Sequence, residues 1–240
     1  LALLIGLGGF IVYQKYFTKG KSIIAPKKAV DSRVANNLDG TKVDKEKATR
    51  HPLAIVIENH PDARPQVGLD KASIIYEAIA EGGITRFMAV YGPYDADKVG
   101  PVRSARTYFI DWLSEFNAFF AHCGGNLDAL DKVKADNILD MDQFGIGDAG
   151  YWREPRSGIA SEHTLFTSTN KLYEIAFNEK HWPKTSDYTA LKFKEPLEVA
   201  LRGAGQKVKI NFSSASYDVV WTFDPKTNAY LREMAGEAHK

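Results

Sequence analysis

Short runs of apolar residues alternate with stretches of helical period through the middle of the chain. The segment LAIVIEN is almost entirely apolar and rich in β-branched residues, which predicts a buried strand. Two further apolar runs are joined by Glu81-Gly82-Gly83, a turn-forming sequence that predicts a pair of neighbouring strands. The expected strands are 53–59, 72–80, 84–92 and 118–123.

Amphipathic stretches between and after these strands predict helices. One helix is expected to begin with Ser104 as its N-cap, because aromatic residues then recur at spacings of three and four along one face. A second is expected after Asn126, and a third over 169–179. Strands that alternate with helices predict a layered α/β domain with a mixed sheet over 51–190.

The pattern changes beyond residue 205. Three short segments alternate apolar and polar positions, and the last two are joined by DPKTN, a turn by its Pro and Asn. We therefore expect a small β-rich domain over 205–240 whose sheet is incomplete at residue 240.

The first residues have a different character again. Thirteen uncharged, mostly apolar residues precede Gln14, which predicts that 1–18 form a membrane anchor or an export signal rather than a buried helix. Residues 19–50 are polar and Lys-rich without a hydrophobic period, so we expect a flexible linker.

Composition excludes some classes of function. Hydrophobic residues make up 44% of the 240 residues, as in an ordinary globular protein, and the net charge of +1 offers no general attraction for nucleic acid. Residues 1–50 carry ten Lys and Arg against four Asp and Glu, so the basic excess belongs to the leading segment. The single cysteine, Cys123, excludes an internal disulfide and a CxxC metal motif.

Two arginines stand where a helix disfavours positive charge. Arg103 and Arg106 flank the expected helix start, and neither has an acidic residue three or four positions on. One explanation is that Glu77 or Glu81 pairs with them across space. The other is an anion site that combines their guanidinium groups with the helix N-terminus.

A second strand-to-helix turn, HCGGN, adds polar groups to the same expected edge of the sheet. His122 ends a strand, and Gly124 and Gly125 suit either a tight turn alone or close approach of a phosphate. The predicted ligand-binding residues are Arg64, Arg86, Arg103, Ser104, Arg106, Gly124, Gly125 and Asn126.

Catalytic groups are less well defined. His60, Glu81 and His122 are the candidates for handling a proton. The six histidines show no HxH or HExxH spacing, so we expect no cofactor, and the spacing does not support a divalent-metal site. No G-x-S-x-G motif surrounds Ser104 or Ser157, which leaves a serine nucleophile without support.

Three segments carry a family resemblance. NHPDARPQ, YEAIAEGGITR and GPVRSAR, with the surrounding residues from 51 to 178, resemble the YerB-like family of bacterial proteins, which are named putative lipoproteins and contain a domain of unknown function. The resemblance implies that the protein is attached to the membrane on its extracytoplasmic face. It also implies that a second, β-rich domain follows the first. The lipidated cysteine that the family name implies is not found in residues 1–50.

A looser similarity suggests a type of ligand. The order of strand, Arg-bearing turn, helix and AFFAHCGGNLDALDKV is similar to the LytR-CpsA-Psr cell-wall phosphotransferases, which hold a lipid pyrophosphate with arginines and a metal. Their Arg-Asp-Thr run is not matched, because Ser104 follows Arg103 and Thr107 follows Arg106.

These observations predict a tethered module that binds an anionic envelope ligand, such as a phosphorylated lipid or glycan, through an arginine-rich pocket. The first alternative is a cell-wall phosphotransferase or hydrolase that acts on a lipid pyrophosphate. The second is a scaffold that contacts an envelope protein through Tyr151 or Trp152.

Overall fold

The computed structural model describes residues 31–239, so the expected anchor at 1–18 lies outside the described residues. Within 31–239, no helix is both long enough and apolar enough to cross a membrane.

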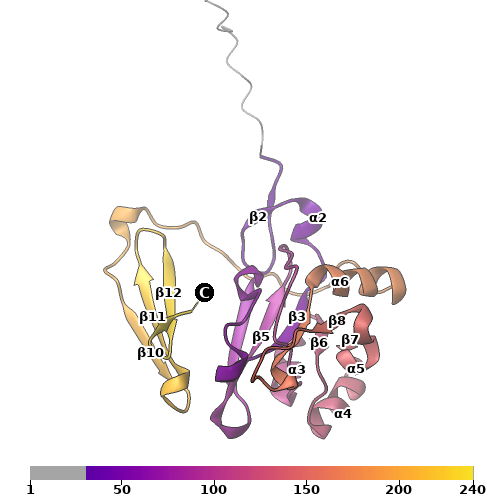
Figure 1. The fold of residues 1–240 in the computed structure, drawn as a ribbon. Helices are drawn as coiled ribbons and strands as arrows, with labels where there is room; N and C mark the ends of the chain where they lie inside the picture. Colours follow the sequence, from indigo (N-terminus) through magenta and orange to yellow (C-terminus); the bar gives the residue numbers. More distant parts are fainter. Residues whose placement is uncertain (1–30, 240) are drawn as a thin grey trace, which may run out of the picture. The chain divides into compact units, whose positions relative to one another are not determined.

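A five-stranded mixed sheet forms the centre of the fold (Figure 1), in the order β4-β5-β3-β6-β7. Its strands are β3 (Leu53–Glu58), β4 (Ile74–Ile79), β5 (Thr85–Tyr91), β6 (Phe119–His122) and β7 (Asp140–Asp142). β4, β5 and β3 pair antiparallel, whereas β3, β6 and β7 pair parallel. The sequence prediction of a mixed α/β domain is confirmed.

The burial of each strand follows its place in the sheet. Every residue of β3 and β5 is buried because each strand has a neighbour on both sides and a core on both faces. Edge strand β4 carries only intermediate and exposed residues. Successive residues of β3 enter different cores, since Leu53 and Ile55 belong to one cluster and Ala54 and Val56 to the other.

Each core is closed by its own helices. The cluster of Ala54 includes residues of α3 (Thr107–Leu113) and α4 (Leu127–Ala135). The cluster of Leu53 includes residues of α6 (Thr169–Glu174) and of its π-helical continuation, Ile175–Glu179. Helices therefore cover both faces of the sheet, as expected for a parallel segment buried on both sides.

Shorter elements connect these layers. β8 (Tyr151–Arg153) and β9 (Leu165–Thr167) form an antiparallel pair, and α5 (Gln143–Ile146) follows β7. Single turns of 3₁₀ helix occupy Pro61–Ala63, Leu69–Lys71, Glu81–Gly83, Gly147–Ala149, Ser161–His163, Val199–Leu201 and Ala215–Tyr217.

The end of the chain forms a separate antiparallel sheet in the order β10-β11-β12-β13. Its strands are β10 (Lys207–Asn211), β11 (Asp218–Asp224), β12 (Ala229–Met234) and β13 (Glu237–Ala238). The three alternating segments of the sequence correspond to β10, β11 and β12, so the predicted β-rich unit is present.

Two local expectations differ from the structure. Residues 33–50, expected within the linker, contain β1 (Val34–Ala35), β2 (Lys42–Val43) and α2 (Lys45–Ala48). Leu38 and Ala48 are buried, and buried contacts of this kind give a polar segment a fixed conformation. Helix α3 begins at Thr107 rather than after Ser104, because Arg103 and Ala105 bond to neighbouring segments as extended chain.

We expect the buried central strand β3 to contribute more to the free energy of unfolding than the edge strand β4. We expect Ile55→Ala to lower the free energy of unfolding by about 2–5 kcal/mol, because it opens a cavity at a fully buried position. Ile79→Ala, on the exposed edge strand β4, should change it by about 1 kcal/mol or less. Urea unfolding of both variants measures the contrast, and equal losses would contradict the described core.

Candidate functional site: a charged network at the end of β3

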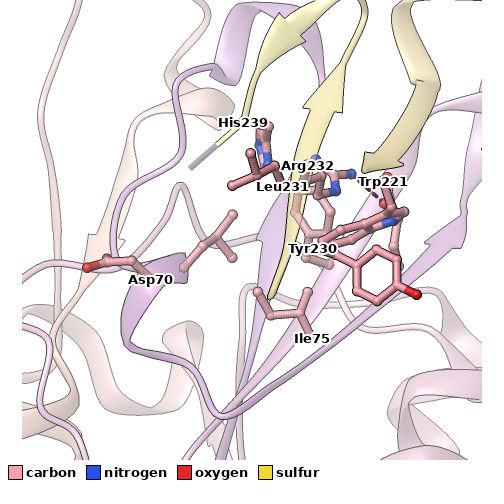
Figure 2. Close-up of a pocket in the computed structure, with 10 residues that line it drawn as sticks. Asp70, Ile75, Trp221, Tyr230, Leu231, Arg232 and His239 are labelled. Atoms are coloured by element: carbon pink, nitrogen blue, oxygen red, sulfur yellow. Dashed lines mark hydrogen bonds and ion pairs between the residues drawn. The ribbon is translucent and has the colours of Figure 1, made fainter. Parts of the chain in front are cut away.

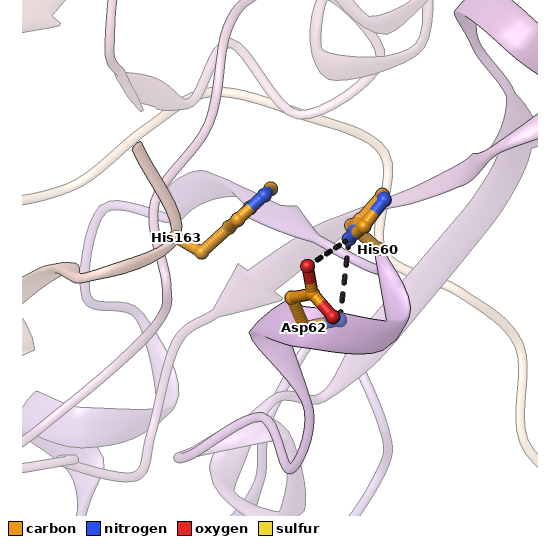
Figure 3. A group of neighbouring side chains, drawn as sticks. All are labelled: His60, Asp62 and His163. Carbon is orange, nitrogen blue, oxygen red and sulfur yellow. Dashed lines mark hydrogen bonds and ion pairs between the residues drawn. The ribbon is translucent and has the colours of Figure 1, made fainter. Parts of the chain in front are cut away.

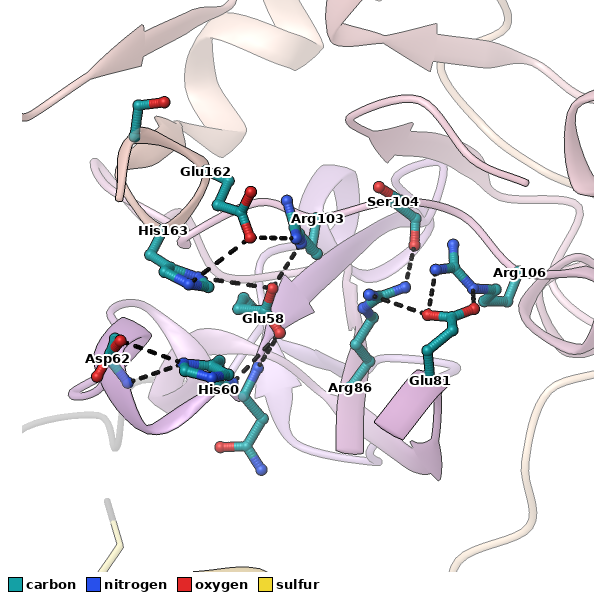
Figure 4. A network of polar contacts seen from close by, with 12 residues as sticks. Glu58, His60, Asp62, Glu81, Arg86, Arg103, Ser104, Arg106, Glu162 and His163 are labelled. Carbon is teal, nitrogen blue, oxygen red and sulfur yellow. Dashed lines mark hydrogen bonds and ion pairs between the residues drawn. The ribbon is translucent and has the colours of Figure 1, made fainter. Parts of the chain in front are cut away.

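Charged residues from four segments meet where the central strands end (Figure 4). Glu58 closes β3 and lies opposite Arg86 in the β3–β5 register. The chain after β5 returns beside β3, where the amide N–H of Arg103 donates to Val56 O. The 3₁₀ turn Ser161–His163 adds Glu162 and His163.

Glu58 is the innermost acid of this network, with only 2% of its surface exposed. Its Oε1 accepts the backbone N–H groups of Asn59 and His60 at 3.1 and 3.2 Å. Its Oε2 lies 2.6 Å from Arg103 Nε, an ion pair without the alignment of a hydrogen bond. Arg103 also contacts Glu162 through Nη2 at 2.9 Å.

A second set of ion pairs, centred on Glu81, lies beside the ion pairs of Glu58. Glu81 accepts from Arg106 through both carboxylate oxygens and lies 3.4 Å from Arg86 Nη2. Arg86 is buried, and Ser104 O accepts from its Nη1 at 3.3 Å. Burial lowers the pKa of Arg86 from its ordinary value, with the charge of Arg106 acting in the same direction. The hydrogen bonds from Arg106 hold the pKa of Glu81 at about 2.

The predicted convergence of Arg86, Arg103 and Arg106 is therefore present, but the three arginines have acidic partners. Of the two explanations that the sequence left open for Arg103 and Arg106, pairing with Glu81 describes Arg106, whereas Arg103 pairs with Glu58 and Glu162. Glu77 instead pairs with Arg232 of β12 at 2.7 Å. In the network, three glutamates balance three arginines, so an anion can enter only by exchange with a carboxylate.

The expected position at the helix start holds for Arg106, which is the N-cap residue of α3, but not for Arg103, which belongs to the extended segment before it. Helix α3 has only seven residues. The amide N–H of Gly124 already donates to Asp142 Oδ1 at 2.8 Å, and Asn126 makes no side-chain cap. Gly124 has φ of 59°, and a Cβ on Gly125 would meet Ala105 at 3.3 Å. The two glycines thus serve a tight turn and close packing.

Arg64 lies apart from the other predicted arginines. Its guanidinium donates to Asn59 and to Ser216 O, and it stands over the ring of Tyr217. Of the remaining predicted ligand residues, Ser104 enters the network through its backbone carbonyl.

His122, a candidate proton carrier, is fully buried. Its Nε2 lies 3.0 Å from Asp140 Oδ1, and its Nδ1 lies 2.8 Å from Gly124 O. Both ring nitrogens are thus engaged inside the fold, which leaves none for a ligand. Its role in this structure is to connect β6, β7 and the glycine turn.

A histidine pair forms the other side of the network (Figure 3). The rings of His60 and His163 are stacked with centroids 4.7 Å apart, and Asp62 lies beside His60. Burial lowers the pKa of His163 from its ordinary value. Sequence reasoning missed this cluster because its histidines lie on distant segments, although His60 itself was a candidate.

A cavity of about 350 Å³ is lined by residues outside the network (Figure 2). Ile75 and Phe87 of the central sheet line one side, and Trp221, Tyr230 and Arg232 of the small sheet line the other. None of its lining residues belongs to the predicted ligand set.

The fold and the network define a mixed α/β domain with a charge-balanced polar site at the end of its central strands, followed by a small antiparallel sheet. The chain belongs to the family described as "Protein of unknown function (DUF3048) N-terminal domain", whose model matches residues 38–183. The YerB-like resemblance is confirmed.

Two comparisons support the family assignment. The protein named "Putative lipoprotein YerB" from Bacillus subtilis (strain 168) is 31% identical over 199 residues, which is 83% of this chain and 60% of that protein. The crystal structure of YerB from Bacillus subtilis aligns with a TM-score of 0.75 and 29% identity over 87% of this chain and 69% of that chain. The chain thus spans about 60% of the length of this curated relative.

The pairing of Glu81 predicts a pH dependence. Its pKa falls from an ordinary 4.5 to about 2, so its stabilising contribution is complete above 4.5 and is lost as the pH falls through 2. We expect the difference in unfolding free energy between the wild type and Glu81→Gln to be constant near neutral pH and to shrink below pH 4.5. Thermal unfolding of both proteins measures it, and a difference that does not vary with pH would contradict the pairing.

Proposed function

We propose that the chain is a membrane-tethered extracytoplasmic domain that binds a phosphorylated lipid or glycan of the cell envelope at Arg86, Arg103 and Arg106. The name of the Bacillus subtilis relative, "Putative lipoprotein YerB", supports the location. The three converging guanidinium groups support the ligand class, since planar N–H forks match phosphate oxygens.

The incomplete bonding of Arg86 is the observation that carries this proposal. Only 6% of its surface is exposed, yet its Nε has no hydrogen-bond partner among residues 31–239. Its other contacts are long, at 3.3 Å to Ser104 O and 3.4 Å to Glu81. A buried charged donor without an acceptor costs free energy, which an additional anion nearby would recover.

Glu81 is the group that such a ligand would displace. Its side chain is 64% exposed whereas those of Arg106 and Arg86 are only 13% and 7% exposed, so water competes for the carboxylate but hardly for the guanidinium groups. It also begins the turn Glu81–Gly83, in which Gly82 and Gly83 both have positive φ. A phosphate brings more acceptor oxygens than a carboxylate, and it would meet Arg86 and Arg106 together.

Inorganic pyrophosphate is the probe for this site. We expect isothermal titration calorimetry of the 240-residue chain to give binding that weakens with added salt. Arg106→Gln should weaken it roughly tenfold or more, because a charge-assisted contact is lost. Glu81→Gln should instead strengthen binding several-fold, because the competing charge is removed while the amide keeps a similar shape.

Lys226→Gln is the matched control, because it removes one positive charge from the exposed turn between β11 and β12. The affinity of the Lys226→Gln variant for pyrophosphate should equal that of the wild type. A weaker or unchanged affinity in Glu81→Gln, with the variant fully folded, would rule out exchange at this site.

A further inference from the structure

One cluster combines the donor atoms that transition metals prefer. Among the described residues, His60, Asp62 and His163 each offer one ligating atom, and these atoms lie within 4.8 Å of one another. His60 and Asp62 come from the turn after β3, and His163 comes from the 3₁₀ turn before β9. The fold therefore brings two imidazoles and one carboxylate together beside the arginine network (Figure 4).

We propose that His60, Asp62 and His163 bind a divalent transition-metal ion of the zinc class. This site is additional to the proposed anion site and does not require it. Two nitrogen donors and one oxygen donor suit Zn²⁺, Co²⁺ or Ni²⁺, whereas Mg²⁺ and Ca²⁺ prefer oxygen donors alone. Three protein ligands leave coordination positions for water or for an oxygen of a phosphate.

The environment of His163 supports this assignment independently. His163 is 6% exposed, and its Nδ1 is buried without a hydrogen-bond partner among residues 31–239. Each ring nitrogen has a carboxylate at 3.8 Å, with Glu58 at Nδ1 and Glu162 at Nε2. At 3.8 Å neither carboxylate accepts a hydrogen bond from the ring, but a small approach of one of them would fix the proton on the nearer nitrogen and leave the other lone pair for a metal, as around many metal-binding histidines.

The local charge also favours a cation. Three carboxylates, those of Asp62, Glu58 and Glu162, surround the histidines. Two guanidinium groups compensate part of this charge, because Arg103 pairs with both glutamates and Arg156 Nη2 donates to the carbonyl oxygens of Asp62 and His163. One negative charge remains for a bound cation to balance. Metal and arginine would then lie on adjacent sides of the same site.

A small rearrangement completes the coordination. Metal–ligand bonds of about 2.0–2.2 Å bring the donor atoms to about 3.3 Å from one another. His60 Nδ1 and Asp62 Oδ2 are 3.7 Å apart, and both side chains are partly exposed and free to adjust. The ring of His60 must rotate out of its stacked orientation so that its donor nitrogen faces the metal, at the cost of its contact with the Asp62 N–H.

Titration with Co²⁺ and Zn²⁺ tests the proposal directly. We expect the tag-free 240-residue chain to bind one Co²⁺ with the intense visible absorption of a low-coordinate site, and Zn²⁺ to displace it while excess Mg²⁺ does not. Asp62→Asn and His60→Gln alter partly exposed side chains and should fold normally, yet each should weaken Co²⁺ binding at least tenfold. His163→Asn should abolish the absorption bands.

The controls are His181→Asn and Asp128→Asn, which change an exposed histidine and an exposed aspartate elsewhere. Both should bind Co²⁺ as the wild type does. Arg106→Gln should retain Co²⁺ while it loses pyrophosphate, so failure of the metal site and failure of the anion site are distinguishable. A wild type that binds no Co²⁺, or folded Asp62→Asn and His60→Gln proteins with wild-type affinity, would overturn the proposal.

Discussion

The site depends on one buried carboxylate. Glu58 ends the central strand β3 with almost no access to water, and a buried charge is tolerated only when partners surround it. Those partners are the N–H groups of Asn59 and His60, the guanidinium of Arg103 and, at a longer distance, the ring of His163. These partners come from three segments, so the pairing of Glu58 brings the turn after β3, the segment before α3 and the turn before β9 to one place.

Charge balance then determines what the site can do. Arginines that already have acidic partners do not form a vacant anion pocket, and a ligand must compete with Glu81 or Glu162, which are both exposed. Glu58 has no such freedom, because its partners include two backbone groups. The network therefore has a fixed inner part around Glu58 and an exchangeable outer part around Glu81. The histidine cluster lies against the fixed part, where the groups around a metal ion would already be held in place by Glu58 and its partners.

The sequence predicted the parts of the fold that depend on apolar pattern. Strands β3, β5 and β6 are fully buried and read clearly as apolar runs, whereas β7, with the sequence DMD, carries no such pattern. The start of α3 was misjudged because long-range hydrogen bonds of Arg103 and Ala105 override the local capping signal of Ser104. The segments that carry the arginines were expected to converge, but the partners of Arg103 were not predicted, since Glu58 and Glu162 lie far from it in sequence. The stacking of His60 on His163 was likewise not predicted, because these two residues also lie far apart in sequence.

A double-mutant cycle between Glu58 and Arg103 tests most directly whether the buried carboxylate organises the site. Urea unfolding would be measured for Glu58→Gln, Arg103→Gln and the double variant. Removal of one partner leaves the other buried and unpaired, so Arg103→Gln should cost about 3–5 kcal/mol, and the double variant should cost less than the sum of the single changes by about 1–3 kcal/mol. Additive losses, or an Arg103→Gln variant as stable as the wild type, would contradict the account.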